Sequence, residues 1–308
     1  MKQNVVIGTR GSKLALWQAE HIAGRIRARY PEIEVTLKKI VTTGDKILDV
    51  PLAKIGGKGL FTKELENAML SGEIDLAVHS LKDMPTELPE GLMLAAITTR
   101  ADASDAFVSL RYKSLDALPQ GAKVGTSSLR RRAQILKYRP DLQTIDLRGN
   151  LDTRIKKLEN QEMDAIILAT AGLKRLGLEQ YITQILPIEI CLPAVGQGAL
   201  AIETRQADAE VLSVLEFLND SETIAAVTAE RAYLREVQGG CQVPVGVHGE
   251  VNGDQLLLEA TILKIDGTRE VRERICGCCS EAEELGIKLA QKMLAAGGKE
   301  ILDELIEY

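Results

Sequence analysis

Short apolar runs followed by capped helices recur along the first two thirds of the chain. The first run, residues 5–7, leads through a short loop to a helix whose N-cap is expected at Ser12. The apolar face of this helix is formed by Ala15, Ala19, Ile22 and Ile26. Pro31 follows its end, and residues 32–37 alternate between polar and apolar side chains as a half-buried strand does. The pattern predicts a strand–helix–strand unit.

The same order of elements returns at residues 122–147. An apolar run ends in Gly-Thr, N-cap candidates follow at 126–128, a helical repeat of apolar residues runs to Pro140, and a second strand pattern comes next. Residues 66–78 and 158–168 form a second matching pair, each with a helix, a turn and a buried strand. This repetition predicts two α/β lobes of similar topology with a cleft between them, and ligands in such sheets lie at the carboxyl ends of the strands.

The two lobes are expected to be joined by two connectors, residues 98–104 and 192–198, with residues 199–203 returning to the first lobe as a strand. After about residue 217 the pattern changes. A helix at 221–237 precedes a three-stranded meander with turns at Asn252-Gly253 and Asp266-Gly267, and two helices end the chain. We therefore expect a first lobe of residues 1–98 and 199–216, a second lobe of 99–198, and a small α+β domain of 217–308.

Positive charge is concentrated in residues 125–157. This segment has nine Lys and Arg against three Asp, a net charge of +6, whereas the whole chain carries −6. Three arginines, Arg130, Arg131 and Arg132, fall in the first turns of the predicted helix, where the helix dipole favours negative charge. A solvated basic face is one interpretation. The other is that an anion binds at the N-terminus of this helix.

Composition limits the class of protein. The chain has 308 residues, 45% hydrophobic and 27% charged, and its isoelectric point is near 5.4, which argues against general nucleic-acid binding. Residues 1–10 reach Arg10 too soon for a signal peptide, and no apolar stretch is long enough to span a membrane. Five cysteines, an odd number, fit reduced thiols, and no pair has zinc-finger spacing with histidine. We expect a cytoplasmic protein without a bound metal.

Several residues outside the basic segment could perform chemistry. Asp83 directly follows a buried strand, where a carboxylate could stabilise a positive intermediate or transfer protons, although an Asp that caps a turn before Pro85 is an equally simple interpretation. His79 is expected to be a core histidine and is left out of the catalytic set. Cys241 follows two glycines on a loop, as an accessible attachment point would, although a lone loop cysteine is more often inert. Lys54 and Lys58 lie in a Gly/Lys-rich loop that could act as a lid over an anionic ligand or be an ordinary exposed loop.

Seven motifs in order along the chain carry a family resemblance. They are I-G-T-R-G-S-K-L-A-L-W-Q-A at the start, G-K-G-L-F-T-K-E-L-E at 57–66, H-S-L-K-D-M-P at 79–85, G-T-S-S-L-R-R-R-A-Q at 125–134, R-G-N-L-D-T-R at 148–154, L-P-A-V-G-Q-G-A-L at 192–200 and G-G-C-Q-V-P at 239–244. The chain closely resembles the hydroxymethylbilane synthase family, also called porphobilinogen deaminases. No departure is seen at a functional position of the family.

The resemblance implies a fold, a cofactor and a reaction. The fold would have two lobes like those of periplasmic binding proteins and a third domain carrying a dipyrromethane, joined by a thioether to Cys241. The enzyme would be a transferase that condenses four porphobilinogen molecules with release of ammonia, with Asp83 as the catalytic carboxylate. Cofactor-binding residues would be Lys82, Asp83, Thr126, Ser128, Arg130, Arg131, Arg148 and Gly172. Substrate-binding residues would be Arg10, Ser12, Ser80, Ser127, Arg148, Arg154, Arg175 and Gln197.

The arginines of the basic segment are expected to differ in role. Arg130, Arg131, Arg148 and Arg154 should face the ligand, because planar guanidinium groups suit the acetate and propionate groups of pyrroles, whereas Arg132 and Arg139 should be structural or solvated. The partner is then a small molecule, with no nucleic acid or membrane, and the protein is expected to be a monomer.

Two other classes of function remain open at this point. A non-catalytic two-lobed protein that binds a small polycarboxylate would explain the lobes and the arginines, but it leaves the Gly-Gly-Cys motif and the third domain without a purpose. An RNA- or DNA-binding module would use the arginine run, but the net acidity and the lack of aromatic residues near that run count against it.

Overall fold

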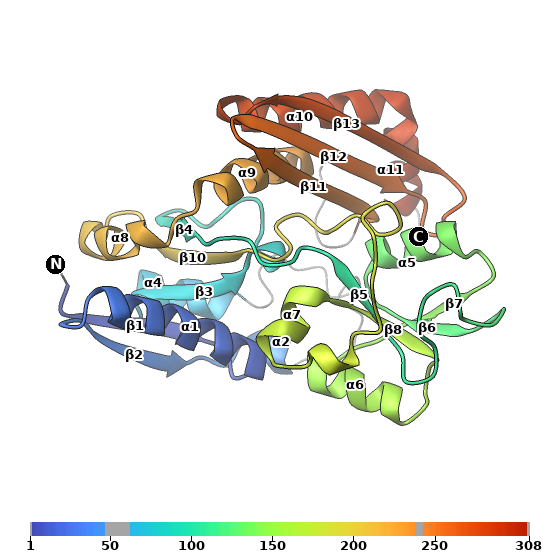
Figure 1. The fold of residues 1–308 in the computed structure, drawn as a ribbon. Helices are drawn as coiled ribbons and strands as arrows, with labels where there is room; N and C mark the ends of the chain where they lie inside the picture. The colour runs from blue at the N-terminus through green and yellow to red at the C-terminus, as the bar shows by residue number, and fades with distance from the viewer. Residues whose placement is uncertain (1, 47–61, 238–242, 307–308) are drawn as a thin grey trace. The chain divides into compact units, whose positions relative to one another are not determined.

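The computed structural model describes residues 2–46, 62–237 and 243–306 of the 308-residue chain. The chain divides into two compact units, residues 1–100 with 199–221, and residues 101–198 with 222–308. Figure 1 shows the helices and strands of both units and labels most of them.

The first unit is built on a five-stranded sheet of order β2-β1-β3-β10-β4. Its strands are β1 (Asn4–Thr9), β2 (Glu34–Lys39), β3 (Leu76–Ser80), β4 (Leu92–Ile97) and β10 (Leu200–Arg205). Its helices are α1 (Lys13–Arg29), α2 (Thr43–Lys46), α4 (Lys63–Leu70) and α8 (Ala209–Leu215), with the 3-10 turns η1 (Leu81–Asp83) and η3 (Glu216–Leu218). Strands β1, β2 and β3 run parallel, whereas β10 is antiparallel to both of its neighbours. The expected return of residues 199–203 to this sheet is confirmed.

Two apolar clusters hold this sheet between its helices. One packs residues of α1 and α8, such as Ile22 and Val211, against Ile7 and Ile202 of the strands. The other packs Leu65 and Met69 of α4 against Ala77 and Leu92. Side chains of a strand alternate between the two faces, so neighbours along β3 serve different clusters.

The second unit contains a sheet of the same design, with the order β7-β6-β8-β5-β9. Its strands are β5 (Asp105–Val108), β6 (Lys123–Gly125), β7 (Gln143–Ile145), β8 (Ala165–Ala169) and β9 (Gln184–Ile185). Its helices are α5 (Leu129–Tyr138), α6 (Leu151–Glu159) and α7 (Thr170–Arg175), with the 3-10 turn η2 (Glu179–Tyr181). Strand β6 is parallel to β7 and β8, and β5 is antiparallel to its neighbours.

The repetition seen in the sequence extends to the helix ends. Ser12 and Ser128 cap α1 and α5 and accept hydrogen bonds from the amides of Ala15 and Arg131. At the other ends Tyr30 and Arg139 adopt nearly the same backbone angles, φ −133 and −131 with ψ 79 in both, each before a proline. The predicted repeat and both N-caps are confirmed.

The second unit also contains the C-terminal segment. Helix α9 (Ser221–Glu236) precedes an antiparallel sheet of β11 (Val245–Asn252), β12 (Gln255–Leu263) and β13 (Glu270–Cys278), which α10 (Ala282–Met293) and α11 (Lys299–Ile306) cover through one apolar cluster. A five-residue π-helical segment joins the two helices. At the β12–β13 turn Gly267 has φ +76, and a Cβ there would lie 2.4 Å from the amide nitrogen of Lys137 on α5. The expected α/β class with a small C-terminal α+β part is confirmed.

Candidate active site

A pocket of about 70 Å³ lies in the first unit, at the carboxyl ends of β1 and β3. Four of the predicted site residues line it: Arg10 and Ser12 from the loop after β1, and Ser80 and Asp83 from the end of β3 and the turn that follows. Parallel strands present their carboxyl ends at one edge of a sheet, which explains why residues about seventy positions apart meet here.

The local backbone fixes these side chains. Ser12 is held as the N-cap of α1, and the Ser80 hydroxyl accepts a hydrogen bond of 2.8 Å from Gln18 Nε2 on the same helix. Asp83 lies in the 3-10 turn that the Met84 amide closes on the Leu81 carbonyl at 3.0 Å. Asp83 is exposed and Lys82 is half-buried, so the carboxylate stands open to a ligand at the edge of the pocket.

His79 and Glu203 add a buried titratable pair to this pocket. His79 lines it, and His79 Nε2 lies 2.9 Å from Glu203 Oε2. His79 is 8% exposed and Glu203 is fully buried. The prediction that His79 is a core histidine with a partner therefore agrees with its burial, but its position on the pocket wall was not foreseen. The one sequence signal was Glu203 itself, an acidic residue inside the apolar strand of residues 199–203.

The predicted cofactor residues of the second unit lie at the carboxyl ends of its three parallel strands. Thr126, Ser127 and Ser128 follow β6, Arg148 follows β7, and Gly172 lies in α7 directly after β8. Ser127 Oγ donates to the Leu147 carbonyl at 2.9 Å and accepts from the Leu147 amide at 3.0 Å, which ties the loop after β6 to the loop after β7.

Arg130 and Arg131 bind one buried carboxylate, Asp105. Arg130 Nη1 donates to Asp105 Oδ2 at 2.7 Å, and Arg131 donates to Oδ1 from Nη2 at 2.7 Å and from Nε at 3.0 Å. The two arginines are 4% and 6% exposed, and Asp105 is fully buried. Burial would raise the pKa of Asp105, but the two guanidinium charges outweigh it and hold that pKa well below its usual range. One carboxylate against two arginines leaves this cluster with a net positive charge.

Other groups adjoin the Asp105 cluster. Arg130 Nη1 donates to the Leu192 carbonyl at 2.6 Å, and Cys191 Sγ donates to Asp105 Oδ2 at 3.2 Å. Burial and the charge of Asp105 raise the pKa of the Cys191 thiol to about 12, so it stays protonated. Gln197 Nε2 donates to Asp105 Oδ1 at 2.9 Å and to the Ala103 carbonyl at 2.6 Å. No sequence pattern joined Asp105 to the arginines, because the contact depends on tertiary packing.

The remaining predicted cations occupy different settings. Arg175 Nη2 donates to the Gly198 carbonyl at 2.7 Å, and burial lowers the Arg175 pKa to about 10. Arg154 is half-buried and donates from Nε to the Gly149 carbonyl at 2.8 Å.

Arg139 binds Asp141 and the carbonyls of Leu115 and Leu118, which makes it structural. Arg132 is half-buried. Cys241, Lys54 and Lys58 lie outside the described residues.

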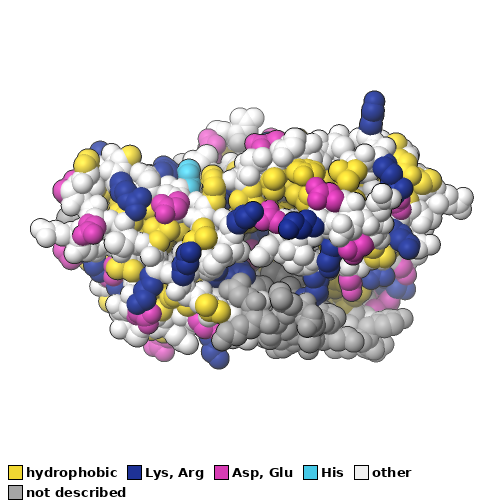
Figure 2. Space-filling model, turned by 90° about the horizontal axis from the view of Figure 1, so that it is seen from below, with side chains coloured by type: hydrophobic (Ala, Val, Ile, Leu, Met, Phe, Trp, Pro, Cys, Tyr) yellow, Lys and Arg dark blue, Asp and Glu magenta, His cyan; other side chains and the backbone are white. Residues whose placement is uncertain are grey.

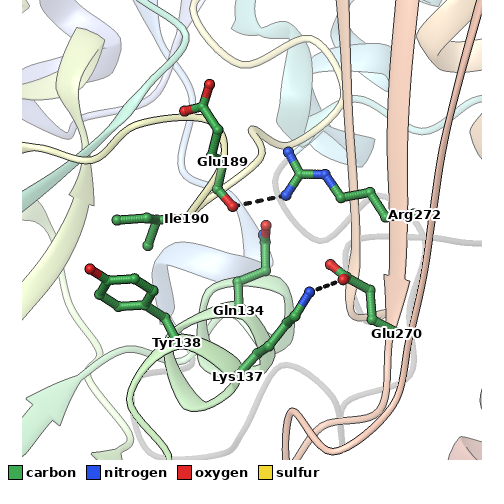
Figure 3. Close-up of a pocket in the computed structure, with 7 residues that line it drawn as sticks. All are labelled: Gln134, Lys137, Tyr138, Glu189, Ile190, Glu270 and Arg272. Atoms are coloured by element: carbon green, nitrogen blue, oxygen red, sulfur yellow. Dashed lines mark hydrogen bonds and ion pairs between the residues drawn. The ribbon is translucent and has the colours of Figure 1, made fainter.

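A larger cavity, of about 180 Å³, lies in the second unit between α5 and β13 and contains none of the predicted site residues. Its lining residues are Gln134, Lys137, Tyr138, Glu189, Ile190, Glu270 and Arg272 (Figure 3). Lys137 forms an ion pair with Glu270, and Arg272 Nη1 donates to the backbone carbonyl of Glu189 at 2.9 Å, so both cations of the cavity already have partners. We assign no ligand to it.

Metal-binding clusters and membrane-spanning helices are absent from the described ranges. Within residues 2–46, 62–237 and 243–306 no group of three or more His, Cys, Asp and Glu side chains is arranged to hold a metal ion. Over the same part of the chain no helix is both long enough and apolar enough to cross a membrane. On the face drawn in Figure 2, Lys and Arg side chains lie among Asp and Glu side chains rather than in one patch.

Comparison with known proteins identifies two matching family models. The model described as "Porphobilinogen deaminase, dipyromethane cofactor binding domain" matches residues 5–213, and the model described as "Porphobilinogen deaminase, C-terminal domain" matches residues 224–295. The porphobilinogen deaminase of Geobacter sulfurreducens is 56% identical over 301 residues, which cover 98% of this chain and 94% of that protein. The porphobilinogen deaminase of Desulforamulus reducens is 52% identical over 305 residues, 99% of each chain.

Two solved structures of binding proteins show a partial likeness to this chain. A putative methionine-binding lipoprotein from Bacillus subtilis has a TM-score of 0.44 at 14% identity, covering 72% of this chain and 92% of that one. The periplasmic aliphatic sulphonate binding protein of Escherichia coli has a TM-score of 0.41 at 16% identity, covering 77% of this chain and 71% of that one.

Proposed function

The chain belongs to the porphobilinogen deaminase family, and from this premise we propose that it condenses four porphobilinogen molecules head to tail into hydroxymethylbilane, with release of ammonia at each step. The reaction supplies the linear tetrapyrrole from which porphyrins and heme are made. The observation that carries the proposal is the full-length family match, and the pocket that gathers Arg10, Ser12, Ser80 and Asp83 supports it.

The cofactor is a dipyrromethane carried on Cys241 through a thioether. When bound, it supplies the pyrrole ring to which the first substrate is joined. The chemistry of the donor set fits its carboxylates, since the Asp105 cluster keeps a net positive charge at the start of α5, where a helix N-terminus also favours anions. The residues that would hold it are Lys82, Asp83, Thr126, Ser128, Arg130, Arg131, Arg148 and Gly172.

A second set of residues is assigned to bind the acetate and propionate side chains of the substrate. These are Arg10, Ser12, Ser80, Ser127, Arg148, Arg154, Arg175 and Gln197, and Lys54 and Lys58 would belong to a lid. Each pyrrole brings an acetate and a propionate, and guanidinium groups bind carboxylates with two parallel hydrogen bonds. For Arg130 and Arg131, contact with a ligand stays a prediction, because their side chains bind Asp105, the Cys191 sulfur and backbone carbonyls.

Asp83 is assigned the catalytic role. Its ionised carboxylate would stabilise the positive charge that forms on the pyrrole when the aminomethyl nitrogen leaves as ammonia. Its exposure at the edge of the pocket, with Arg10 among the other lining residues, supports this assignment.

The organisation of the protein follows the same proposal. We assign three domains, 1–98 with 199–216, 99–198, and 217–308, and a monomer that acts in the cytoplasm on a small molecule, without nucleic acid or membrane as partner. The four described cysteines are free thiols, as a reducing compartment keeps them.

Intact mass of the purified protein, combined with an ammonia-release assay, tests the function. We expect the mass of the chain plus a two-pyrrole adduct, loss of that adduct in Cys241→Ser, and release of ammonia from porphobilinogen by the wild type only. The matched control is Cys276→Ser, which removes an exposed thiol and should keep adduct and activity. A wild type that is unmodified and fully active would overturn the cofactor assignment, and one without activity would overturn the function.

A further inference from the structure

His79 and Glu203 form a buried histidine–carboxylate pair on adjacent strands of the first unit. In the β3–β10 register His79 lies opposite Ala201, two residues before Glu203, so both side chains project from the same face of the sheet. His79 Nε2 and Glu203 Oε2 are 2.9 Å apart. This is the geometry in which a carboxylate fixes the orientation and tautomer of an imidazole.

The pair is largely shielded from solvent, because His79 is 8% exposed and Glu203 is fully buried. Glu203 is fully buried, and its Oε1 atom has no hydrogen-bond partner among the described residues. A buried carboxylate is costly unless it is paired, and His79 is the partner recorded at Oε2. Nearby on α4, Glu66 is also buried, and burial, with a smaller contribution from the charge of Glu203, raises the Glu66 pKa.

Because Nε2 contacts Glu203, the second ring nitrogen of His79, Nδ1, is the atom that could accept a further proton. With the proton on Nε2 and shared with Glu203, Nδ1 carries a lone pair. His79 lines the same pocket as Asp83, Arg10 and Ser12. The charged groups around the imidazole are then Glu203 on β10, Glu66 on α4, and Asp83 and Arg10 at the pocket edge.

The proposed reaction needs a proton acceptor in addition to a fixed negative charge. In each condensation the C–N bond of the incoming aminomethyl group breaks, and ammonia leaves with the electron pair. The new C–C bond takes its electron pair from the α-carbon of the acceptor pyrrole, and that carbon then loses its proton so that the ring regains its aromatic electrons. A carboxylate that accepted this proton would lose the charge with which it stabilises the cation.

We propose that His79 accepts this proton at Nδ1 and that Glu203 positions it and stabilises the imidazolium, an inference that rests on the proposed function. The imidazolium returns the proton to the released ammonia, which leaves as ammonium. The substrate enters with its aminomethyl group protonated, and one ammonium ion leaves. Atoms and charges therefore balance without an added reactant. Among the titratable residues that line the pocket, Arg10 offers only donors and Asp83 is needed as a negative charge, which leaves the His79 imidazole as the proton acceptor.

The test compares His79→Gln and Glu203→Gln with His21→Gln as the matched control. His21 lies on α1, stacks on Trp17 and is not among the residues that line the pocket. Intact mass is measured first, so that only protein carrying the adduct enters kinetics between pH 5.5 and 9. We expect His79→Gln to lower kcat about 100-fold with KM within about threefold of the wild type, as loss of a general base does. His21→Gln should change neither.

Glu203→Gln distinguishes a positioning role from a merely structural one. Removal of the carboxylate charge disfavours the protonated imidazole, so the acid limb of the pH profile of kcat should move about one unit to lower pH. The three histidines of the chain also allow an independent readout, because the imidazole NMR signal missing in His79→Gln should titrate at lower pH in Glu203→Gln.

The outcomes separate this inference from the proposed function. An active wild type together with a His79→Gln variant of wild-type kcat and pH profile would overturn the role of His79 and leave the function intact. An unchanged acid limb in Glu203→Gln would overturn the positioning role of Glu203. If His79→Gln fails to carry the adduct, the pH profile of Glu203→Gln alone tests the inference. A wild type that releases no ammonia from porphobilinogen at any pH overturns the function itself.

Discussion

Asp105 Oδ1 accepts two hydrogen bonds from Arg131, from Nη2 at 2.7 Å and from Nε at 3.0 Å, with both side chains buried. Arg130 occupies the other carboxylate oxygen. Breaking a buried ion pair from one side leaves uncompensated charge in a dry environment. We expect Asp105→Asn to lower the free energy of unfolding by about 3–5 kcal/mol, measured by urea denaturation.

The control for this variant is Asp141→Asn. Asp141 pairs with Arg139 at 2.7 Å nearer the surface, and loss of such a solvent-screened pair should lower the free energy of unfolding far less than loss of the Asp105 carboxylate does. Because the folded-state pKa of Asp105 is lowered, its contribution is present above the unfolded-state pKa and is lost as the pH falls towards the folded value. The deficit of Asp105→Asn should therefore be equal at pH 6 and pH 8 and shrink only below about pH 4. Equal losses in the two variants would contradict the argument.

The outcome for these residues shows where sequence reasoning succeeds. Ser12 was predicted as an N-cap and Ser128 was one of three candidates at 126–128, because a cap depends on residues within one turn of each other. The repeated strand–helix–strand units followed from local periodicity, and their similarity indicated that the two lobes share a topology. The pocket residues Arg10 and Asp83 could be placed together because both follow parallel strands.

Contacts between residues far apart in the sequence could not be predicted from local sequence patterns. Asp105 and Arg130 are 25 residues apart, and His79 and Glu203 are 124 residues apart. Each pair meets only because an antiparallel strand enters a sheet begun elsewhere, β5 beside β8 and β10 beside β3. Hydrophobic patterning predicts which face of a strand is buried, but it does not predict which strand lies beside it in the sheet. The sequence therefore indicated the arginine cluster but not the Asp105 carboxylate that neutralises part of its charge.

Cys191 should be inert toward alkylation in the native protein. It is fully buried, and its pKa of about 12 leaves almost no thiolate at pH 8, which is the reactive form. The exposed Cys276 should react first when the folded protein is treated with iodoacetamide and analysed by peptide mass spectrometry. Modification of Cys191 at the rate of Cys276 would show that the Asp105 cluster opens in solution.

Glu66 should make stability depend on pH in the direction opposite to Asp105. Because burial raises the Glu66 pKa, the folded state binds its proton more tightly than the unfolded state, and stability decreases as the pH rises through that range. Glu66→Gln, which removes this ionisation, should raise the free energy of unfolding relative to the wild type more at pH 8 than at pH 4. Urea titrations at the two pH values measure the difference, and a larger gain at pH 4 would refute the assignment.

Two helical glycines should respond to alanine with opposite signs. A Cβ at Gly286 on α10 would lie 2.2 Å from the Ala229 carbonyl oxygen of α9, so Gly286→Ala must separate the two helices and should cost about 1–3 kcal/mol of stability. Gly24 on α1 has nothing within 4 Å of the same position, and Gly24→Ala should stabilise by about 0.4–1 kcal/mol. Thermal and urea unfolding of both variants test the pair. A stabilised Gly286→Ala would mean that α9 and α10 pack less closely than the structure indicates.

Asp83→Asn separates binding of the cofactor from turnover. The amide keeps the size of the carboxylate and can still hydrogen-bond to a pyrrole nitrogen through its oxygen, but it lacks the charge that stabilises a cationic ring. Because Asp83 is exposed in a 3-10 turn closed by backbone hydrogen bonds, the substitution should leave the fold and the thermal midpoint unchanged. We expect the two-pyrrole adduct to be retained and ammonia release to fall at least about 100-fold.

Asp116→Asn, at a surface carboxylate that binds Tyr138, is the control and should keep full activity. Normal ammonia release by Asp83→Asn would remove Asp83 from the catalytic role and leave His79 as the titratable group of the pocket to examine next.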